Sequence, residues 1–212
     1  MPLPKPAYET ANRILDNAEN LVQTKGFNGF SYADIAAALN VTKASIHYHF
    51  PAKAALGESL IERYRNSFQS ALARIDASGE DTGSKLRAYA AIYADVLEKG
   101  RMCLCGMMAA DYATLPAPMQ QSVQEFFRCN ERWLSALIAD GMERAELSTA
   151  GPAVEDARVL VAGLEGAMLI ARMRGDMRWF RSTAERLLRG LGVRSPARNS
   201  RKQHMVRGRA SA

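Results

Sequence analysis

Apolar residues recur along this chain with the three- and four-residue spacing of amphipathic helices. In the first stretch, about residues 8–25, the apolar positions are Ala11, Ile14, Leu15, Ala18, Leu21 and Val22. Gly26 follows as a residue that ends helices well. No segment of any length alternates between apolar and polar residues as a strand does. The pattern therefore predicts an all-α fold without internal repeats.

The stretch from residue 31 to residue 53 predicts two short helices joined by a tight turn. Ser31 is a good N-cap, and Asp34 three residues later completes an approximate capping box. Asn40 suits a helix end, and Thr42 caps a second helix of about two turns. Pro51 cannot continue that helix but suits the first turn of another. The whole stretch has the form of a helix-turn-helix.

Beyond this motif the periodicity predicts five further helices. They cover about residues 51–75, 84–99, 118–146, 154–174 and 176–191. The helix over 154–174 is nearly apolar all round in its middle, so one face must contact its own domain and another face something else. We expect an arm over 1–7, a DNA-binding domain over 8–50, a second domain over 51–192 and a basic disordered tail over 193–212.

Composition favours a globular protein of the cytoplasm. Hydrophobic residues make up 48% of 212 residues, three cysteines are an odd number, and neither a signal peptide nor a transmembrane segment is visible. The net charge is +6, yet six basic residues and no acidic ones lie from Arg194 onward. The other 193 residues carry 22 basic and 22 acidic residues, so the excess positive charge belongs to the tail.

The motif residues resemble the signature of the tetracycline-repressor (TetR) family. The resemblance rests on the Asp34-Ile35-Ala36 segment, on residues 41–46 (VTKASI) and on residues 48–53 (YHFPAK) with Leu56. It is specific over about residues 8–60. It implies a transcriptional regulator, most often a repressor, that binds a near-palindromic DNA operator as a homodimer and is released by a small-molecule effector.

The resemblance and the outward positions of the second helix give the candidate DNA contacts. These are Ser31, Tyr32, Thr42, Lys43, Ala44, His47, Tyr48, His49 and Lys53, with Ala44 and Tyr48 as the expected base readers. His47 departs from the family, which most often has a tyrosine there that contacts a phosphate. Neutral histidine can donate one hydrogen bond, so operator affinity could depend on pH.

Two further sets of residues follow for the second domain. The expected effector pocket is lined by Tyr89, Tyr93, Cys103, Met108, Tyr112, Phe127, Trp133, Glu165 and Met168. Glu165 stands out because a lone carboxylate in an apolar helix must be paired, wet or at an interface. In the family the last two helices form a four-helix dimer interface. Its expected residues here are Leu160, Gly163, Leu164, Ala167, Ala184, Leu187 and Leu188.

Enzymatic chemistry finds little support in the sequence. No phosphate loop, HExxH or nucleophile elbow is present, and we expect no catalytic residue, metal or cofactor. Cys103 and Cys105 are either small buried hydrophobes or the site of a reactive thiol, Cys103, at a helix start near Arg101. Residues 103–106 resemble a segment of TetR-type sensors of electrophiles. Two alternatives stay open, a metal site with Cys129 and a helical ligand-binding protein or enzyme whose N-terminal helices are structural.

Overall fold

The computed structural model describes residues 5–194, and most of the predicted arm and tail, residues 1–4 and 195–212, lies outside this range. The described chain is all α, as predicted. Its helices are α1 (Lys5–Lys25), α2 (Tyr32–Leu39), α3 (Lys43–His49), α4 (Lys53–Asp76), α5 (Thr82–Glu98), α6 (Leu104–Ala110), α7 (Ala117–Glu143), α8 (Ala153–Arg174) and α9 (Met177–Gly190), with a short 3-10 turn η1 (Tyr112–Thr114). Within residues 5–194 no helix is long and apolar enough to span a bilayer.

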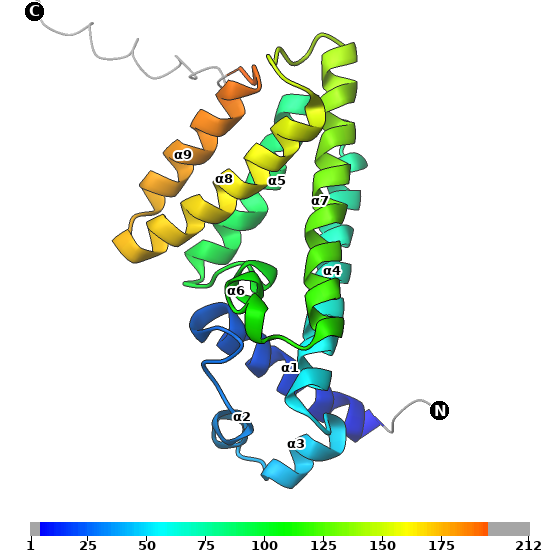
Figure 1. Cartoon of the computed structure of the whole chain (residues 1–212), viewed down its shortest axis with the longest axis vertical. Coiled ribbons are helices and arrows are strands. Elements are labelled where there is room, and N and C mark those ends of the chain that lie inside the picture. The colour runs from blue at the N-terminus through cyan, green and yellow to red at the C-terminus, as the bar shows by residue number, and fades with distance from the viewer. Residues whose placement is uncertain (1–4, 195–212) are drawn as a thin grey trace, which may run out of the picture.

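The first three helices form one end of the molecule (Figure 1). Their apolar faces meet in a small core, in which Ile14, Ala18, Ile35 and Ile46 are fully buried. Phe50 closes this core behind α3 and is also buried. The three helices thus bury their apolar stripes against each other, which leaves their polar sides to solvent.

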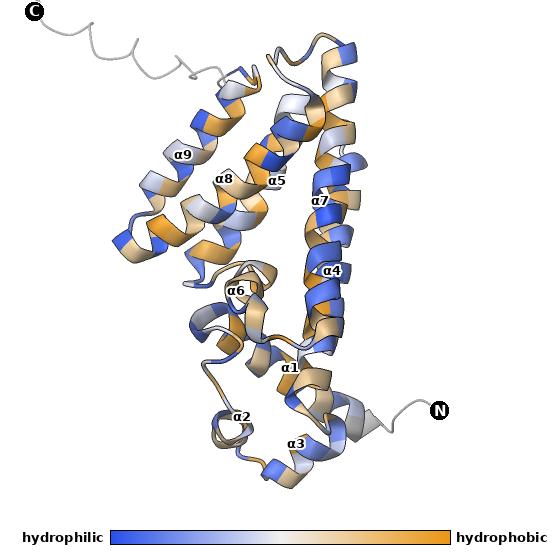
Figure 2. Cartoon of the chain, in the orientation of Figure 1, coloured by the Kyte–Doolittle hydropathy of each residue, from blue (hydrophilic) through white to orange (hydrophobic). Residues whose placement is uncertain are grey.

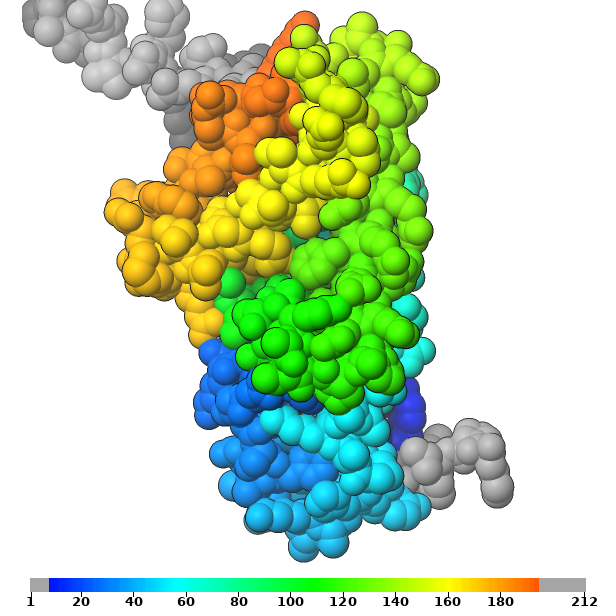
Figure 3. All heavy atoms as spheres, in the orientation of Figure 1, coloured from blue at the N-terminus to red at the C-terminus, as the bar shows by residue number. Residues whose placement is uncertain are grey.

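The remaining helices form a bundle that extends from this unit (Figure 1). Long helices α4 and α7 pack on each other, and α8 packs between α7 and α9. The bundle core is rich in aromatic rings, with Tyr89, Tyr93, Phe126 and Phe180 all buried. Helix α8 carries fewer hydrophilic residues than α7 (Figure 2), and it lies open on the molecular surface beside α9 (Figure 3).

Three helix starts differ from the prediction by two residues or more. Helix α1 already begins at Lys5, because Pro6 is compatible with a first helical turn. Helix α4 begins at Lys53 and not at Pro51, since the Pro51 carbonyl accepts a hydrogen bond from His47 that holds this turn outside the helix. Helix α5 begins at Thr82 because the Asp81 side chain, and not Ser84, is its cap.

Candidate DNA-binding surface and effector domain

The helix-turn-helix is built by local hydrogen bonds that its sequence supplies. The Ser31 hydroxyl accepts from the Ala33 N–H at 3.2 Å, and the Ser31 backbone N–H donates to the Asp34 carboxylate at 2.7 Å, which completes the capping box. Asn40 ends α2 in the left-handed conformation, with φ of 53°. The Thr42 hydroxyl accepts from the Ser45 N–H at 3.1 Å and caps α3. These bonds fix the angle between α2 and α3.

Helix α3 presents a continuous outer face. Ile46 anchors its inner side, whereas Thr42, Lys43, Ala44, His47 and Tyr48 are exposed. Tyr48 is the most open of them, with 71% of its surface accessible. This face offers a cation, a methyl group, an imidazole and a phenol, which are the groups that contact phosphates and base edges in a major groove.

Tyr32 and Lys53, both expected on DNA, are turned inward. Tyr32 is buried and its hydroxyl donates to the Phe50 carbonyl at 2.8 Å, and burial raises its pKa to about 12. The Lys53 ammonium donates to the carbonyls of Phe27 and Phe30 at 2.6 and 2.5 Å and lies over both rings. Both side chains therefore hold the unit together, and Lys53 is not a free phosphate ligand.

The two histidines of α3 have different surroundings. The His47 ring packs edge-on against the Tyr32 ring at 4.8 Å, and its Nδ1 lies 3.2 Å from the Pro51 carbonyl. A carbonyl only accepts, so Nδ1 must carry a proton, and Nε2 of the neutral ring has none to give. Only the imidazolium form can therefore donate to a phosphate. His49 is half-buried against Tyr48 and Phe50, and its Nδ1 is buried.

Six of the nine expected effector residues gather in the interior of the bundle. Tyr89, Tyr93, Cys103, Met108 and Met168 are all buried there. The two tyrosine hydroxyls lie 3.0 Å apart. This group forms part of the packed core of the folded protomer.

Glu165 enters this core from α8. One of its carboxyl oxygens, Oε1, is buried without a hydrogen-bond partner. The other lies so close to Gly106 of α6 that a Cβ there would come within 2.4 Å. Burial raises the pKa of Glu165 to about 7, and a hydrogen bond with Cys103 only partly offsets this effect. The carboxyl group is therefore poised between its two charge states near neutral pH.

The Cys103 thiol does not have the setting of a reactive thiolate. Its sulfur accepts from the Gly106 N–H at 3.4 Å as the cap of α6. Burial raises the pKa of Cys103 well above its ordinary value, and the Glu165 carboxylate raises it further. The expected lowering by the helix start and Arg101 is thus outweighed. Burial also raises the pKa of Cys105, so both thiols stay protonated in this conformation.

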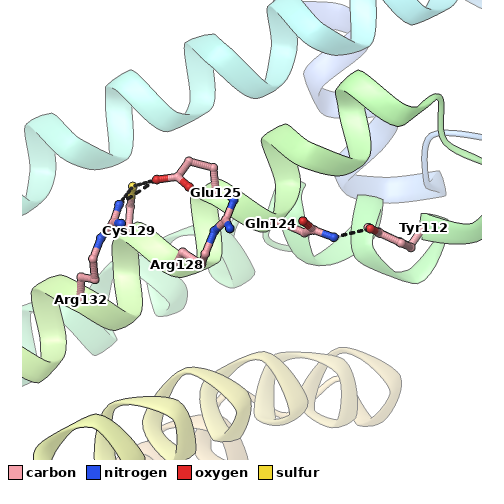
Figure 4. A network of polar contacts seen from close by, with 6 residues as sticks. All are labelled: Tyr112, Gln124, Glu125, Arg128, Cys129 and Arg132. Carbon is pink, nitrogen blue, oxygen red and sulfur yellow. Dashed lines mark hydrogen bonds and ion pairs between the residues drawn. The ribbon is translucent and has the colours of Figure 1, made fainter.

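The other expected effector residues lie outside this core. Tyr112 and Phe127 border a shallow cleft of about 370 Å³ beside α7. The Gln124 amide donates to the Tyr112 hydroxyl at 2.5 Å, as Figure 4 shows. Trp133 stacks on Tyr89 at 5.7 Å and donates to Asp76 at 2.9 Å. The nine residues therefore do not line one common pocket.

Cys129 lies on α7 next to this cleft, in a separate polar network. Its thiol donates to Glu125 at 3.1 Å, and Arg132 contacts both groups (Figure 4). Within residues 5–194 no three His, Cys, Asp or Glu side chains come together as metal ligands would. The three-cysteine metal site considered from the sequence is therefore not assembled.

Comparison with known proteins places this architecture in a family. The model of bacterial regulatory proteins of the tetR family matches residues 14–60, and the model of the tetracyclin repressor-like C-terminal domain matches residues 83–187. A TetR-family transcriptional regulator from Agrobacterium tumefaciens has 31% identity, covers 87% of this chain and 98% of its own, and superposes with a TM-score of 0.84. The chain belongs to the TetR family. It is a DNA-binding transcriptional regulator and not an enzyme.

Two curated relatives agree with this assignment. The HTH-type transcriptional repressor NemR of Escherichia coli is 26% identical over 172 residues, which are 78% of this chain and 85% of NemR. The negative transcriptional regulator IcaR of Staphylococcus aureus is 39% identical over 51 residues, which cover 24% of this chain and 27% of IcaR. The family match removes the alternative of a helical enzyme with purely structural N-terminal helices.

The residues expected at a TetR dimer interface lie mostly inside the protomer. Leu160, Leu164, Ala167, Ala184 and Leu188 are buried between α8, α9 and their neighbours. A Cβ on Gly163 would come within 2.7 Å of Leu187, so these two residues close the α8–α9 contact. The periodicity identified the apolar helices correctly, but it could not tell the inner face of α8 from the outer one.

The outer face of α8 carries a different apolar stripe. Val159, Leu169 and Met173 are 60%, 59% and 72% exposed, and Ala162 and Gly166 lie between them with three- and four-residue spacing. Nothing lies within 4 Å of a Cβ built on Gly166. We call these five residues the α8 stripe. Such a run of exposed apolar residues marks an interaction surface.

The junction of the two TetR domains depends on residues that periodicity alone did not identify. Arg172 of α8 donates to the carbonyl of Thr24 at 2.6 Å and approaches that of Gln23 at 3.4 Å, at the end of α1. Asp111 after α6 accepts from the Asn28 N–H at 3.2 Å. Arg63 of α4 pairs with two carboxylates on α1. A cation that reaches the last turn of a helix from 148 residues away leaves no local signal in the sequence.

Proposed function

We propose that this regulator is a homodimeric repressor that binds a near-palindromic operator in the cytoplasm and releases it when a small molecule binds the C-terminal domain. The exposed outer face of α3 supplies the DNA contacts. The α8 stripe supplies a two-fold contact, because a helix that exposes a self-complementary apolar face can pack on its own copy. Two-fold symmetry then presents two α3 helices to half-sites about one DNA turn, roughly 34 Å, apart.

The observation that carries the release step is the hydrogen bonding of Arg172 to the end of α1. Through this contact a shift of α8 changes the position of α1, and with it the direction of α3. Arg63 and Asp111 connect the same unit to α4 and α6, so three helices of the bundle, α4, α6 and α8, contact the DNA-binding unit directly. An effector then needs only to favour one arrangement of these helices over another.

The repressor role is supported by NemR and IcaR, which are a repressor and a negative regulator of transcription. The reactive-thiol alternative gains no support from this conformation, because Cys103 and Cys105 are both buried and protonated. We therefore propose reversible ligand binding as the release mechanism.

Genomic DNA pull-down with the purified protein, followed by sequencing of the bound fragments, tests this proposal. A near-palindromic sequence that binds one dimer with steep salt dependence is the expected result. Recovery of a site without two-fold symmetry, or binding by a monomer, would contradict the dimeric mechanism. Arg172→Ala is the matched test of coupling: it should keep operator affinity but lose most of the response to effector.

A further inference from the structure

A cleft of about 360 Å³ lies where α1, α4 and α5 meet. We call it the junction cleft. It lies between the DNA-binding unit and the bundle, since α1 belongs to the former and α5 to the latter. Its volume falls within the range of small-molecule sites. Unlike the packed interior around Glu165, it offers open space to a ligand.

The floor of the junction cleft is apolar. Tyr64 and Phe68 of α4 contribute aromatic rings whose centroids are 6.2 Å apart, and Ile92 and Val96 of α5 contribute aliphatic surface. Phe68 is buried and packs edge-on against both Tyr89 and Tyr93, so its ring is fixed in position. Such a floor suits a flat, apolar ring.

The walls of the cleft carry three cations without partners. Arg74 of α4, and Lys99 and Arg101 after α5, border the space. Among residues 5–194 none of them forms an ion pair within 4.0 Å. Two acids also border it, but Glu19 is already paired with Arg63. The unpaired charges that border the cleft are therefore one acid, Asp95, and three cations, and their sum is positive.

Gln23 provides a buried polar group in the same wall. It is only 2% exposed, and its side-chain oxygen is buried without a hydrogen-bond partner. A buried acceptor without a partner costs free energy, which a ligand hydroxyl or N–H could recover. The backbone of Gln23 is meanwhile held by the Met102 N–H and by Arg172.

We propose that the junction cleft is the effector site and that it takes an amphipathic organic anion, an aromatic carboxylate that also carries a hydroxyl group. The ring lies on Tyr64 and Phe68, the carboxylate is held by Lys99 and Arg101, and the hydroxyl donates to Gln23. The inference rests on the proposed function for its regulatory meaning. A ligand in this position touches α1, α4 and α5 at once and changes how α1 is held next to Arg172.

Calorimetry of the full-length protein with three para-substituted phenols of similar size tests the chemistry of the cleft. The probes are 4-hydroxybenzoate, 4-hydroxybenzyl alcohol and 4-hydroxybenzylamine, used at about pH 7.5, where carboxylic acids are ionised and amines protonated. The acid should bind about tenfold or more tightly than the neutral alcohol, and the amine should bind most weakly. Equal binding of the three probes, or preference for the amine, would overturn the proposal.

Variants locate the site. Lys99→Gln combined with Arg101→Gln should weaken binding of 4-hydroxybenzoate by about tenfold or more, and Gln23→Leu should remove the preference for 4-hydroxybenzoate over benzoate. Arg128→Gln, an exposed change on α7, is the matched control and should bind like the wild type. Unchanged binding by the double variant, with its fold confirmed by circular dichroism, would overturn the assignment of the cleft.

Operator titrations separate this inference from the proposed function. The wild type should lose operator affinity when 4-hydroxybenzoate is added, and the Lys99 and Arg101 double variant should keep it. Calorimetric binding without any effect on the operator would reject the cleft as the effector site. Failure of the ligand-free protein to bind any specific DNA would instead reject the proposed function, while calorimetry would still judge the chemistry of the cleft.

Discussion

The buried carboxyl group of Glu165 should make the free energy of unfolding depend on pH. Burial raises its pKa from an ordinary value of 4.5 to about 7 in the folded protein. The unfolded chain therefore releases this proton at a lower pH than the folded chain does. Below about pH 4.5 the group is protonated in both states and has no effect, and the folded state loses stability as pH rises from there through 7.

The size of the effect follows from the interval between the two pKa values. One pH unit corresponds to about 1.4 kcal/mol, so Glu165 lowers the free energy of unfolding by about 3 kcal/mol above pH 7. Glu165→Gln keeps the size of the side chain and removes the charge. The variant should therefore be more stable than the wild type by about 3 kcal/mol at pH 8 and by close to nothing at pH 4.5.

Urea unfolding of both proteins between about pH 4.5 and pH 8, at one protein concentration, measures this difference. Groups common to both proteins cancel in the difference, which isolates Glu165. Glu125→Gln is a control in which the stability difference from the wild type should change with pH in the opposite direction. The reason is that hydrogen bonds from Cys129 and Arg132 lower the pKa of Glu125. A difference between wild type and Glu165→Gln that stays constant with pH would refute a buried, titrating carboxyl group.

Three further outcomes follow from the DNA-binding unit and from α8. Lys53→Met should lower the free energy of unfolding by about 2 kcal/mol and leave the salt dependence of operator binding unchanged. Lys43→Ala should instead reduce, by about 1, the slope of the logarithm of operator affinity against the logarithm of salt concentration. His47→Phe, which keeps an aromatic ring next to Tyr32 but removes both ring nitrogens, should weaken operator binding about tenfold; unchanged affinity would contradict a contact between His47 and a phosphate. Gly166→Arg should give monomers in light scattering without loss of fold, whereas the exposed Ala73→Arg on α4 should remain dimeric.

The helix-turn-helix could be predicted from the sequence because the signals that build it are local. Ser31, Asn40 and Thr42 act within four residues of their own position, so their caps could be placed from the sequence alone. The same is true of the all-α fold, since helical periodicity is a property of neighbouring turns. The exposed face of α3 could also be predicted from the sequence, because the apolar residues Ile46 and Phe50 identify its inner side.

What lies opposite each helix face was decided only by the tertiary structure. The sequence predicts Lys53 as a surface cation, yet its ammonium group points inward and donates to two carbonyls 23 and 26 residues away. Helix α8 is apolar on both faces, so only the position of α9 determined that Leu164 lies inside and Leu169 outside. The sequence determined which segments are helical and which end contacts DNA. Packing decided which side chains remain free, because burial depends on neighbours that are distant in the chain.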